Sequence, residues 1–178
     1  MSLPLSPDDL EAISSVLVRR AKRLAEGSVV ANYEAGAAEI LVVGVGKATY
    51  AMRLEHLDGV LPIKSLTPLP TTPRLVAGLT VYQGQPVSVV RLGALLGQRQ
   101  TDQVRAGVLL RIVQDVVVLG VDAYVGVRGY SESELSPMPG TVSPDVARCF
   151  CGMLPGDTGL LNMSVIAEIL ANSAESET

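Results

Sequence analysis

Histidine and cysteine are scarce in this chain of 178 residues, which contains one histidine and two cysteines. Any catalytic triad or histidine-rich metal site would therefore depend on His56 alone. Cys149 and Cys151 are too few for a disulfide framework, and without a second Cys/His pair they cannot complete a tetrahedral zinc site. On one strand both thiols would point to the same face, which predicts small apolar core residues. We expect no catalytic residue, no metal site and no cofactor.

An excess of positive charge and long apolar runs are also missing. The net charge is −4, from 14 basic and 18 acidic residues, and residues 129–178 contain seven acidic residues against one basic residue. This balance disfavours nucleic acid and anionic membranes as partners. No apolar run approaches the roughly 18–20 residues that span a bilayer, and the N-terminus lacks the pattern of a secretory signal. We expect a cytoplasmic protein that neither binds nucleic acid nor inserts into membranes.

The first segment predicts an amphipathic helix. Ser6 can cap it, Pro7 suits the first helical position and Gly27 supplies the stop. One apolar stripe recurs at steps of three and four residues: Leu10, Ile13, Leu17, Ala21 and Leu24. Four basic residues fall in the last turns, where a helix favours cations: Arg19, Arg20, Lys22 and Arg23. We expect residues 1–38 to be this helix and a linker, and residues 39–178 to be the main domain.

From Glu39 onward the pattern changes to short β-rich runs separated by turn residues. Short strands without intervening helices favour small barrels over a parallel sheet. A short strand at 159–163 and a helix from Ser164 are expected to end the domain. The other predicted strands are 39–45, 48–54, 59–64, 75–82, 86–91, 107–113, 115–121, 123–128 and 146–153.

Glycines mark the predicted turns. Gly46-Lys47 is expected to form the first hairpin turn and Gly84-Gln85 the second, because glycine tolerates positive φ. As a nucleotide site, the Gly44–Lys47 segment fails both tests: Ala48 stands where a Walker loop needs Ser or Thr, and Thr49 where a dinucleotide fingerprint needs glycine. Two further segments are expected to be irregular: a polar linker between two similar β clusters at 98–105, and a long loop at 129–144.

Several segments together resemble a known family. Their order and spacing are similar to those of CheW-like chemotaxis coupling domains, and the spacing from Tyr50 to Gly84 fits without a gap. The segments are Tyr50-Ala-Met-Arg-Leu, Leu66-Thr-Pro-Leu-Pro-Thr-Thr-Pro73, Gly78 to Leu92, Leu119-Gly-Val-Asp-Ala-Tyr-Val-Gly-Val, Pro137-Met-Pro139 and Gly159-Leu-Leu-Asn-Met.

The resemblance implies an all-β fold with terminal helices, in which two five-stranded SH3-like barrels are intertwined. It also implies a protein without enzymatic activity. Members of this family bridge methyl-accepting chemoreceptors to the regulatory domain of a CheA-like histidine kinase. We therefore expect these two partners, and the sequence leaves the oligomeric state open.

The same resemblance implies the protein-binding residues. They are Leu57, Gly59, Val81, Tyr82, Gln83, Gly84, Arg91 and Leu92, with exposed apolar patches expected at Leu57, Val81, Tyr82 and Leu92. Gln83 replaces the arginine of the family's Asn-Leu-Arg-Gly motif and Gly59 replaces its usual glutamate. Glutamine cannot supply the charge of an arginine fork, which weakens the expectation of receptor binding. An alternative hypothesis is a module with another protein partner, whose N-terminal helix docks in cis or mediates dimerisation.

Overall fold

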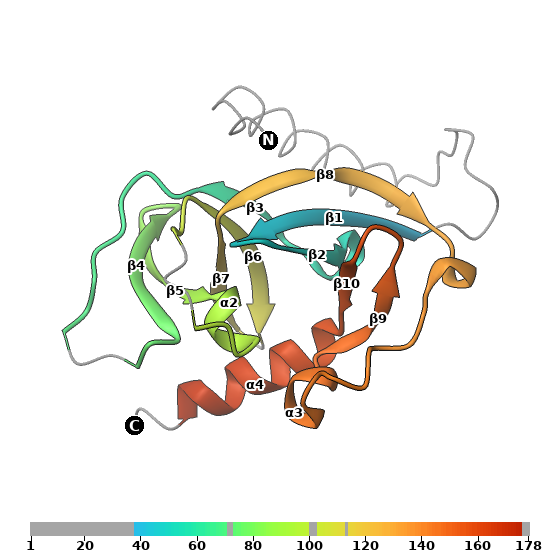
Figure 1. The fold of residues 1–178 in the computed structure, drawn as a ribbon. Helices are drawn as coiled ribbons and strands as arrows, with labels where there is room; N and C mark the ends of the chain where they lie inside the picture. Colours follow the sequence, from blue (N-terminus) through green and yellow to red (C-terminus); the bar gives the residue numbers. More distant parts are fainter. Residues whose placement is uncertain (1–37, 71–72, 100–102, 113, 176–178) are drawn as a thin grey trace.

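The chain forms two five-stranded, mainly antiparallel sheets followed by a C-terminal helix (Figure 1). The computed structural model describes residues 38–70, 73–99, 103–112 and 114–175, so the predicted N-terminal helix lies outside the described residues. The strands are β1 (Ala38–Val45), β2 (Ala48–Arg53), β3 (Gly59–Pro62), β4 (Val76–Tyr82), β5 (Gln85–Arg91), β6 (Ala106–Ile112), β7 (Asp115–Val121), β8 (Ala123–Tyr130), β9 (Phe150–Leu154) and β10 (Thr158–Leu161). The helical elements are η1 (Leu54–His56), α2 (Leu92–Leu95), η2 (Glu132–Glu134), α3 (Pro144–Ala147) and α4 (Met163–Glu175).

The two sheets are intertwined along the chain. One has the order β8-β1-β2-β10-β9 and the other β3-β6-β7-β5-β4, and we call them barrel A and barrel B. The chain therefore leaves barrel A after β2, forms every strand of barrel B, and returns to complete barrel A. Each barrel also contains one parallel pair, β2 with β10 and β5 with β7. These features confirm the predicted fold of two SH3-like barrel subdomains.

The two barrels repeat one topology. If barrel A is read from β8 through β10 and then β1 and β2, its strands occupy the same positions as β3 through β7 of barrel B. A helix follows the equivalent strand in both cases, α2 after β5 and α4 after β10. The expectation that segment 98–105 links two similar β clusters is wrong, because the strands on both sides of it, β5 and β6, belong to barrel B. The two similar units are the barrels themselves.

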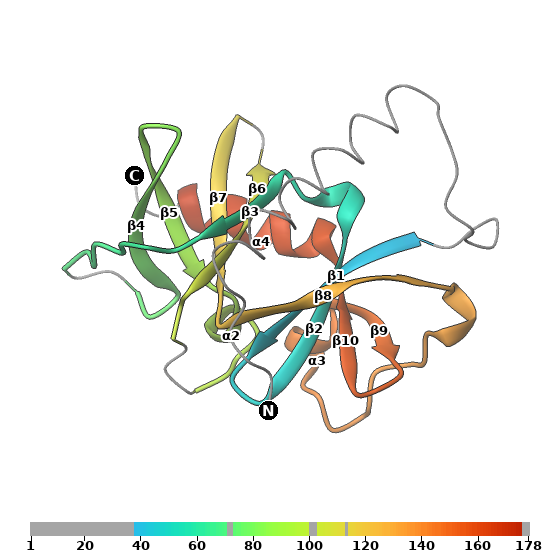
Figure 2. The same ribbon diagram turned by 90° about the horizontal axis from the view of Figure 1, so that it is seen from above.

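A central core joins both barrels to α4. Strand β1 is buried on both faces: Leu41, Val43 and Val45 enter the central core, whereas Ile40 and Val42 point into barrel A. Buried side chains of β6, β7 and α4 complete the central core, and barrel B has its own small core around Val89 and Val118. Figures 1 and 2 show α4 lying across one side of the molecule against both barrels.

Each barrel is closed by a loop segment that bonds to its edge strand. Thr67 exchanges two backbone hydrogen bonds with Leu79 of β4 (N···O 2.8 and 2.9 Å), and Ser136 does the same with Met153 of β9 (2.8 and 2.7 Å). A glycine lies beside each bridge. A Cβ atom on Gly78 would lie 2.3 Å from the Thr67 carbonyl oxygen, and one on Gly152 would lie 2.5 Å from that of Ser136. Close backbone approach thus requires glycine at both positions.

The first hairpin turn is confirmed and the second is displaced by one residue. Gly46 has a φ of 60°, and Val45 pairs with Ala48 across the turn. In the second hairpin Tyr82 pairs with Gln85, so the turn consists of Gln83 and Gly84, with φ values of 50° and 78°. A two-residue turn of this kind needs positive φ at both central residues, and a glutamine therefore occupies a left-handed conformation here.

The region from 129 to 153 differs most from the sequence expectation. Strand β8 extends to Tyr130, and η2 follows with a capping box between Ser131 and Glu134. The predicted strand over 146–153 begins too early, since α3 occupies its first residues and β9 starts at Phe150. The shared face predicted for the two thiols is wrong for the same reason. Cys149 precedes the strand and is buried, whereas Cys151 lies on β9 and is exposed.

Candidate protein-interaction site

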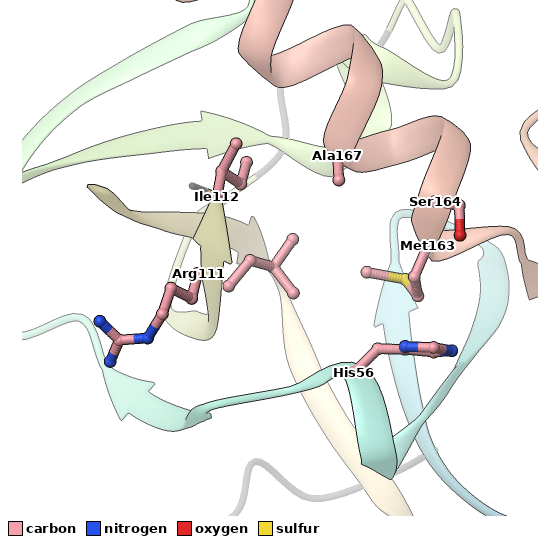
Figure 3. A pocket seen from close by; sticks show the side chains of 7 residues that line it. His56, Arg111, Ile112, Met163, Ser164 and Ala167 are labelled. Atoms are coloured by element: carbon pink, nitrogen blue, oxygen red, sulfur yellow. The ribbon is translucent and has the colours of Figure 1, made fainter. Parts of the chain in front are cut away.

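A cavity of about 180 Å³ lies where the two barrels meet α4 (Figure 3). We call it the inter-barrel groove, since η1 follows a strand of barrel A and β6 belongs to barrel B. Asn162 positions its third wall, because its side-chain oxygen accepts a hydrogen bond from the Val165 backbone N–H (3.4 Å) at the start of α4. The residues lining the groove are His56, Leu110, Arg111, Ile112, Met163, Ser164 and Ala167.

The floor of the groove is apolar and its rim is charged. At one rim His56 lies 3.5 Å from the carboxylate of Glu55, and at the opposite rim Arg111 pairs with Asp58 at 3.0 Å. Arg53 extends the first rim, since its guanidinium lies 3.8 Å from Glu55 and 3.3 Å from Glu132. An apolar floor between polar rims is the usual form of a groove that accepts an amphipathic helix.

Two of the expected binding residues, Leu57 and Gly59, follow η1 directly. Leu57 is half-buried and contacts the central core, so only part of its side chain faces solvent. Gly59 opens β3 with an ordinary backbone conformation, and a Cβ atom there would meet Leu109 at 3.4 Å. Packing therefore leaves room for a Cβ atom at position 59, and the backbone does not demand glycine.

Four other expected residues form the tip of the β4–β5 hairpin. Val81 is 62% exposed on edge strand β4, and Gln83 and Gly84 are also exposed. Tyr82 is half-buried against the core of barrel B, and its hydroxyl accepts a hydrogen bond from the Gln83 amide at 3.1 Å. Figure 2 shows this hairpin on the side of barrel B remote from barrel A.

The last two expected residues lie elsewhere. Arg91 ends β5 and is half-buried, with its backbone N–H donating to the Leu75 carbonyl at 2.7 Å. Leu92 is 0% exposed and belongs to the central core, so the expectation of an exposed apolar patch there is wrong. The reason is that Leu92 begins α2, which packs against β7 and holds this side chain inside. The eight residues thus fall into three places, not one site.

Tyr124 joins the barrels, and sequence reasoning assigned it no role. Its hydroxyl accepts hydrogen bonds from the backbone N–H groups of Leu61 and Gly107 (3.2 Å each) and donates to the Gly107 carbonyl. Tyr124 belongs to β8 of barrel A, whereas Leu61 and Gly107 are paired residues of barrel B. Burial raises the pKa of Tyr124 well above its usual value, because a phenolate would be poorly solvated there. The only signal in the sequence was its place in the Leu119–Val127 segment.

The remaining candidates for chemistry are isolated. His56 is exposed and lies at the rim of the inter-barrel groove. Burial raises the pKa of the Cys149 thiol, whose sulfur contacts the Asp145 carbonyl at 3.7 Å. Within the described residues, no three His, Cys, Asp or Glu side chains gather as metal ligands. No helix in that part of the chain is long and apolar enough to cross a bilayer.

Two intertwined SH3-like barrels with an inter-barrel groove define a scaffold type of domain. The chain belongs to the family of the CheW-like domain, whose model matches residues 39–171. The fold is similar to the solved structure of the scaffolding protein TtCheW from Thermoanaerobacter tengcongensis, with a TM-score of 0.59 and 21% sequence identity. That match covers 71% of this chain and 89% of the other. No curated protein sequence matched the chain.

Proposed function

We propose that the protein is a non-enzymatic adaptor in chemotaxis-type signal transduction, which couples chemoreceptors to a CheA-like histidine kinase. The observation that carries the proposal is the separation of two candidate protein-binding surfaces on one CheW-like domain. The inter-barrel groove lies between η1, β6 and α4, whereas the exposed β4–β5 hairpin lies on the far side of barrel B. Two partners can therefore be bound at the same time.

The groove suits the helical tip of a receptor. Leu110, Ile112 and Met163 offer an apolar floor to one face of a helix, and the charged rims restrict its orientation. The family resemblance assigns Leu57, Gly59 and Gln83 to receptor binding, and the first two lie beside this groove. A helix bound in the groove would contact η1, which follows a strand of barrel A, and β6 of barrel B.

The β4–β5 hairpin suits a barrel of the kinase. Val81 is a large apolar side chain exposed on an edge strand, and isolated apolar contacts of this kind act as anchors when a partner buries them. The regulatory domain of the kinase contains the same type of barrel. We therefore assign the kinase contact to Val81 and Tyr82.

The kinase contact can be tested with two matched variants. Val81→Glu and Val125→Glu place the same charge on two exposed valines, which are 62% and 53% exposed in barrels B and A. We expect light scattering to show a complex with the kinase regulatory domain that Val81→Glu weakens at least about tenfold, a cost of about 1.4 kcal/mol. Val125→Glu should leave it intact. Absence of any complex at tens of micromolar, with both proteins folded, would refute the kinase half of the proposal.

A second candidate is a CheW-like regulatory module with a different protein partner. Gln83 favours it, because this exposed turn residue lacks the charge of the arginine that the family motif places there. The pair Gln83→Arg and Gly59→Glu restores both family residues, and a Cβ atom is tolerated at position 59. If a chemoreceptor is the partner, the restored protein should bind a receptor-tip fragment more tightly than the natural chain. Unchanged binding would favour the second candidate.

A further inference from the structure

We propose that residues 6–27 of the chain dock in cis, as an amphipathic helix, into the inter-barrel groove. The contact itself requires no partner protein. Its consequence rests on the proposed function, since a helix in the groove would compete with the receptor tip and make receptor binding conditional. The occupant is thus a segment of this chain, which the position, the charge and the apolar lining of the groove all favour.

Position brings the segment close to the groove. The N-terminal segment joins barrel A at Ala38, which pairs with Tyr130, and η1 contacts β1 near this end. Figures 1 and 2 both place η1 beside the start of β1. Ten residues, 28–37, separate the predicted helix from Ala38, and they can extend to about 35 Å. A tether of this length holds the helix near the groove at an effective concentration in the millimolar range.

Charge favours the same placement. Glutamates predominate in the cluster that adjoins η1, in which Arg53 pairs with Glu55 and Glu132 and Arg128 pairs with Glu134. Together with Glu39 this cluster has a net charge of −2. The predicted helix ends with four basic residues within residues 19–23. The opposite rim offers no competing positive charge, because Arg111 there is paired with Asp58. The acidic side chains of the group are Glu39, Glu55, Glu132 and Glu134.

The apolar surfaces also match. The predicted helix carries one narrow stripe, centred on Leu17, and its remaining faces are mainly polar. The groove offers a floor of comparable character, to which β6 contributes Leu110 and Ile112 and α4 contributes Met163 and Ala167. A helix of 22 residues is about 33 Å long, so part of its stripe would cover the cavity of about 180 Å³ and the rest would extend past its rims. Burying the stripe removes apolar side chains from water on both partners.

His56 provides a direct readout, because it is the only histidine of the chain and it lines the groove. Its imidazole carbon–proton resonance can be followed by NMR in the full chain at fixed pH. Leu17→Glu places a charge in the centre of the stripe, and Ser15→Glu places the same charge on the opposite face of the predicted helix. We expect Leu17→Glu to shift the His56 resonance and Ser15→Glu to leave it unchanged. Ile13→Glu replaces the first variant if Leu17→Glu does not fold.

The alternatives give different results. If the stripe variants leave His56 unchanged, the docking is refuted. If their effect disappears on dilution and light scattering shows a dimer that becomes a monomer, the occupant is the helix of a second copy and docking in cis is refuted. The experiment contains neither receptor nor kinase. A negative result therefore leaves the proposed function standing, and a failed kinase complex leaves the docking standing.

Discussion

At the scale of single residues, Tyr124 is the side chain whose hydrogen bonds link barrel A directly to barrel B. Its hydroxyl bonds to the backbone of Leu61 and Gly107 in a region where Tyr124 itself is only 5% exposed. Tyr124→Phe keeps the ring but removes the hydroxyl, so the backbone groups of Leu61 and Gly107 lose these hydrogen bonds. We expect a loss of about 1–2 kcal/mol in the free energy of unfolding, measured by urea denaturation. Tyr82→Phe, at a half-exposed position, is the matched control.

The same hydroxyl predicts a loss of stability at alkaline pH. Burial raises the pKa of folded Tyr124 above the value near 10 of an unfolded tyrosine. Above that pH the unfolded chain releases the proton while the folded chain retains it, so rising pH favours the unfolded state. Thermal midpoints measured from pH 9 to 11 should fall less steeply in Tyr124→Phe than in the natural protein. Equal slopes would mean that the hydroxyl is not held as described.

Leu92 shows why the place of a residue in the sheet could be predicted better than the direction in which its side chain points. The family resemblance placed Leu92 next to binding residues, but whether a side chain at the end of β5 points outward depends on the next element. Here that element is α2, and its packing against β7 turns Leu92 inward. Val81, in contrast, lies within a strand, where alternation with the buried Thr80 indicates an outward direction.

At the scale of elements, the two bridges that close the barrels depend on Gly78 and Gly152. Gly78→Ala and Gly152→Ala would place a Cβ atom against a backbone carbonyl and would strain φ values of 146° and 155°. We expect each to cost about 2–3 kcal/mol of stability. Gly126→Ala is the control, because no atom lies within 4 Å of its Cβ position, and it should change stability by less than about 0.5 kcal/mol. Thermal unfolding followed by circular dichroism measures all three; a cost for Gly126→Ala equal to the others would contradict this account.

Most strands could be predicted because their apolar runs and turn glycines are local signals. The start of the strand predicted at 146–153 was wrong because the apolar run around Cys149 and Cys151 outweighed the helix signal that precedes it, Ser143 followed by Pro144 and Asp145. Pairing of distant strands could not be derived from local pattern. The family resemblance implied intertwined barrels without naming the paired strands, and no local signal links β2 to β10, which pair in barrel A.

At the scale of the whole molecule, the central core makes the two barrels one cooperative unit. It combines side chains of β1 and β2 from barrel A with those of β6 and β7 from barrel B, and α4 covers them. The barrels should unfold together, because opening either barrel would expose the core that both share. This arrangement fixes the inter-barrel groove, since its walls come from both barrels and α4.

Ile166 tests this cooperativity because it is 0% exposed in α4 and contacts the shared core. Ile166→Ala should lower the free energy of unfolding by about 2–5 kcal/mol through lost burial and an unfilled cavity. Hydrogen exchange measured by mass spectrometry should then accelerate by a similar factor in peptides of both barrels, although the substitution lies in neither. Glu168→Ala, on the exposed side of the same helix, should leave exchange nearly unchanged. If exchange accelerated only in the strands of one barrel, the two barrels would unfold independently, and the shared core would not make them one cooperative unit.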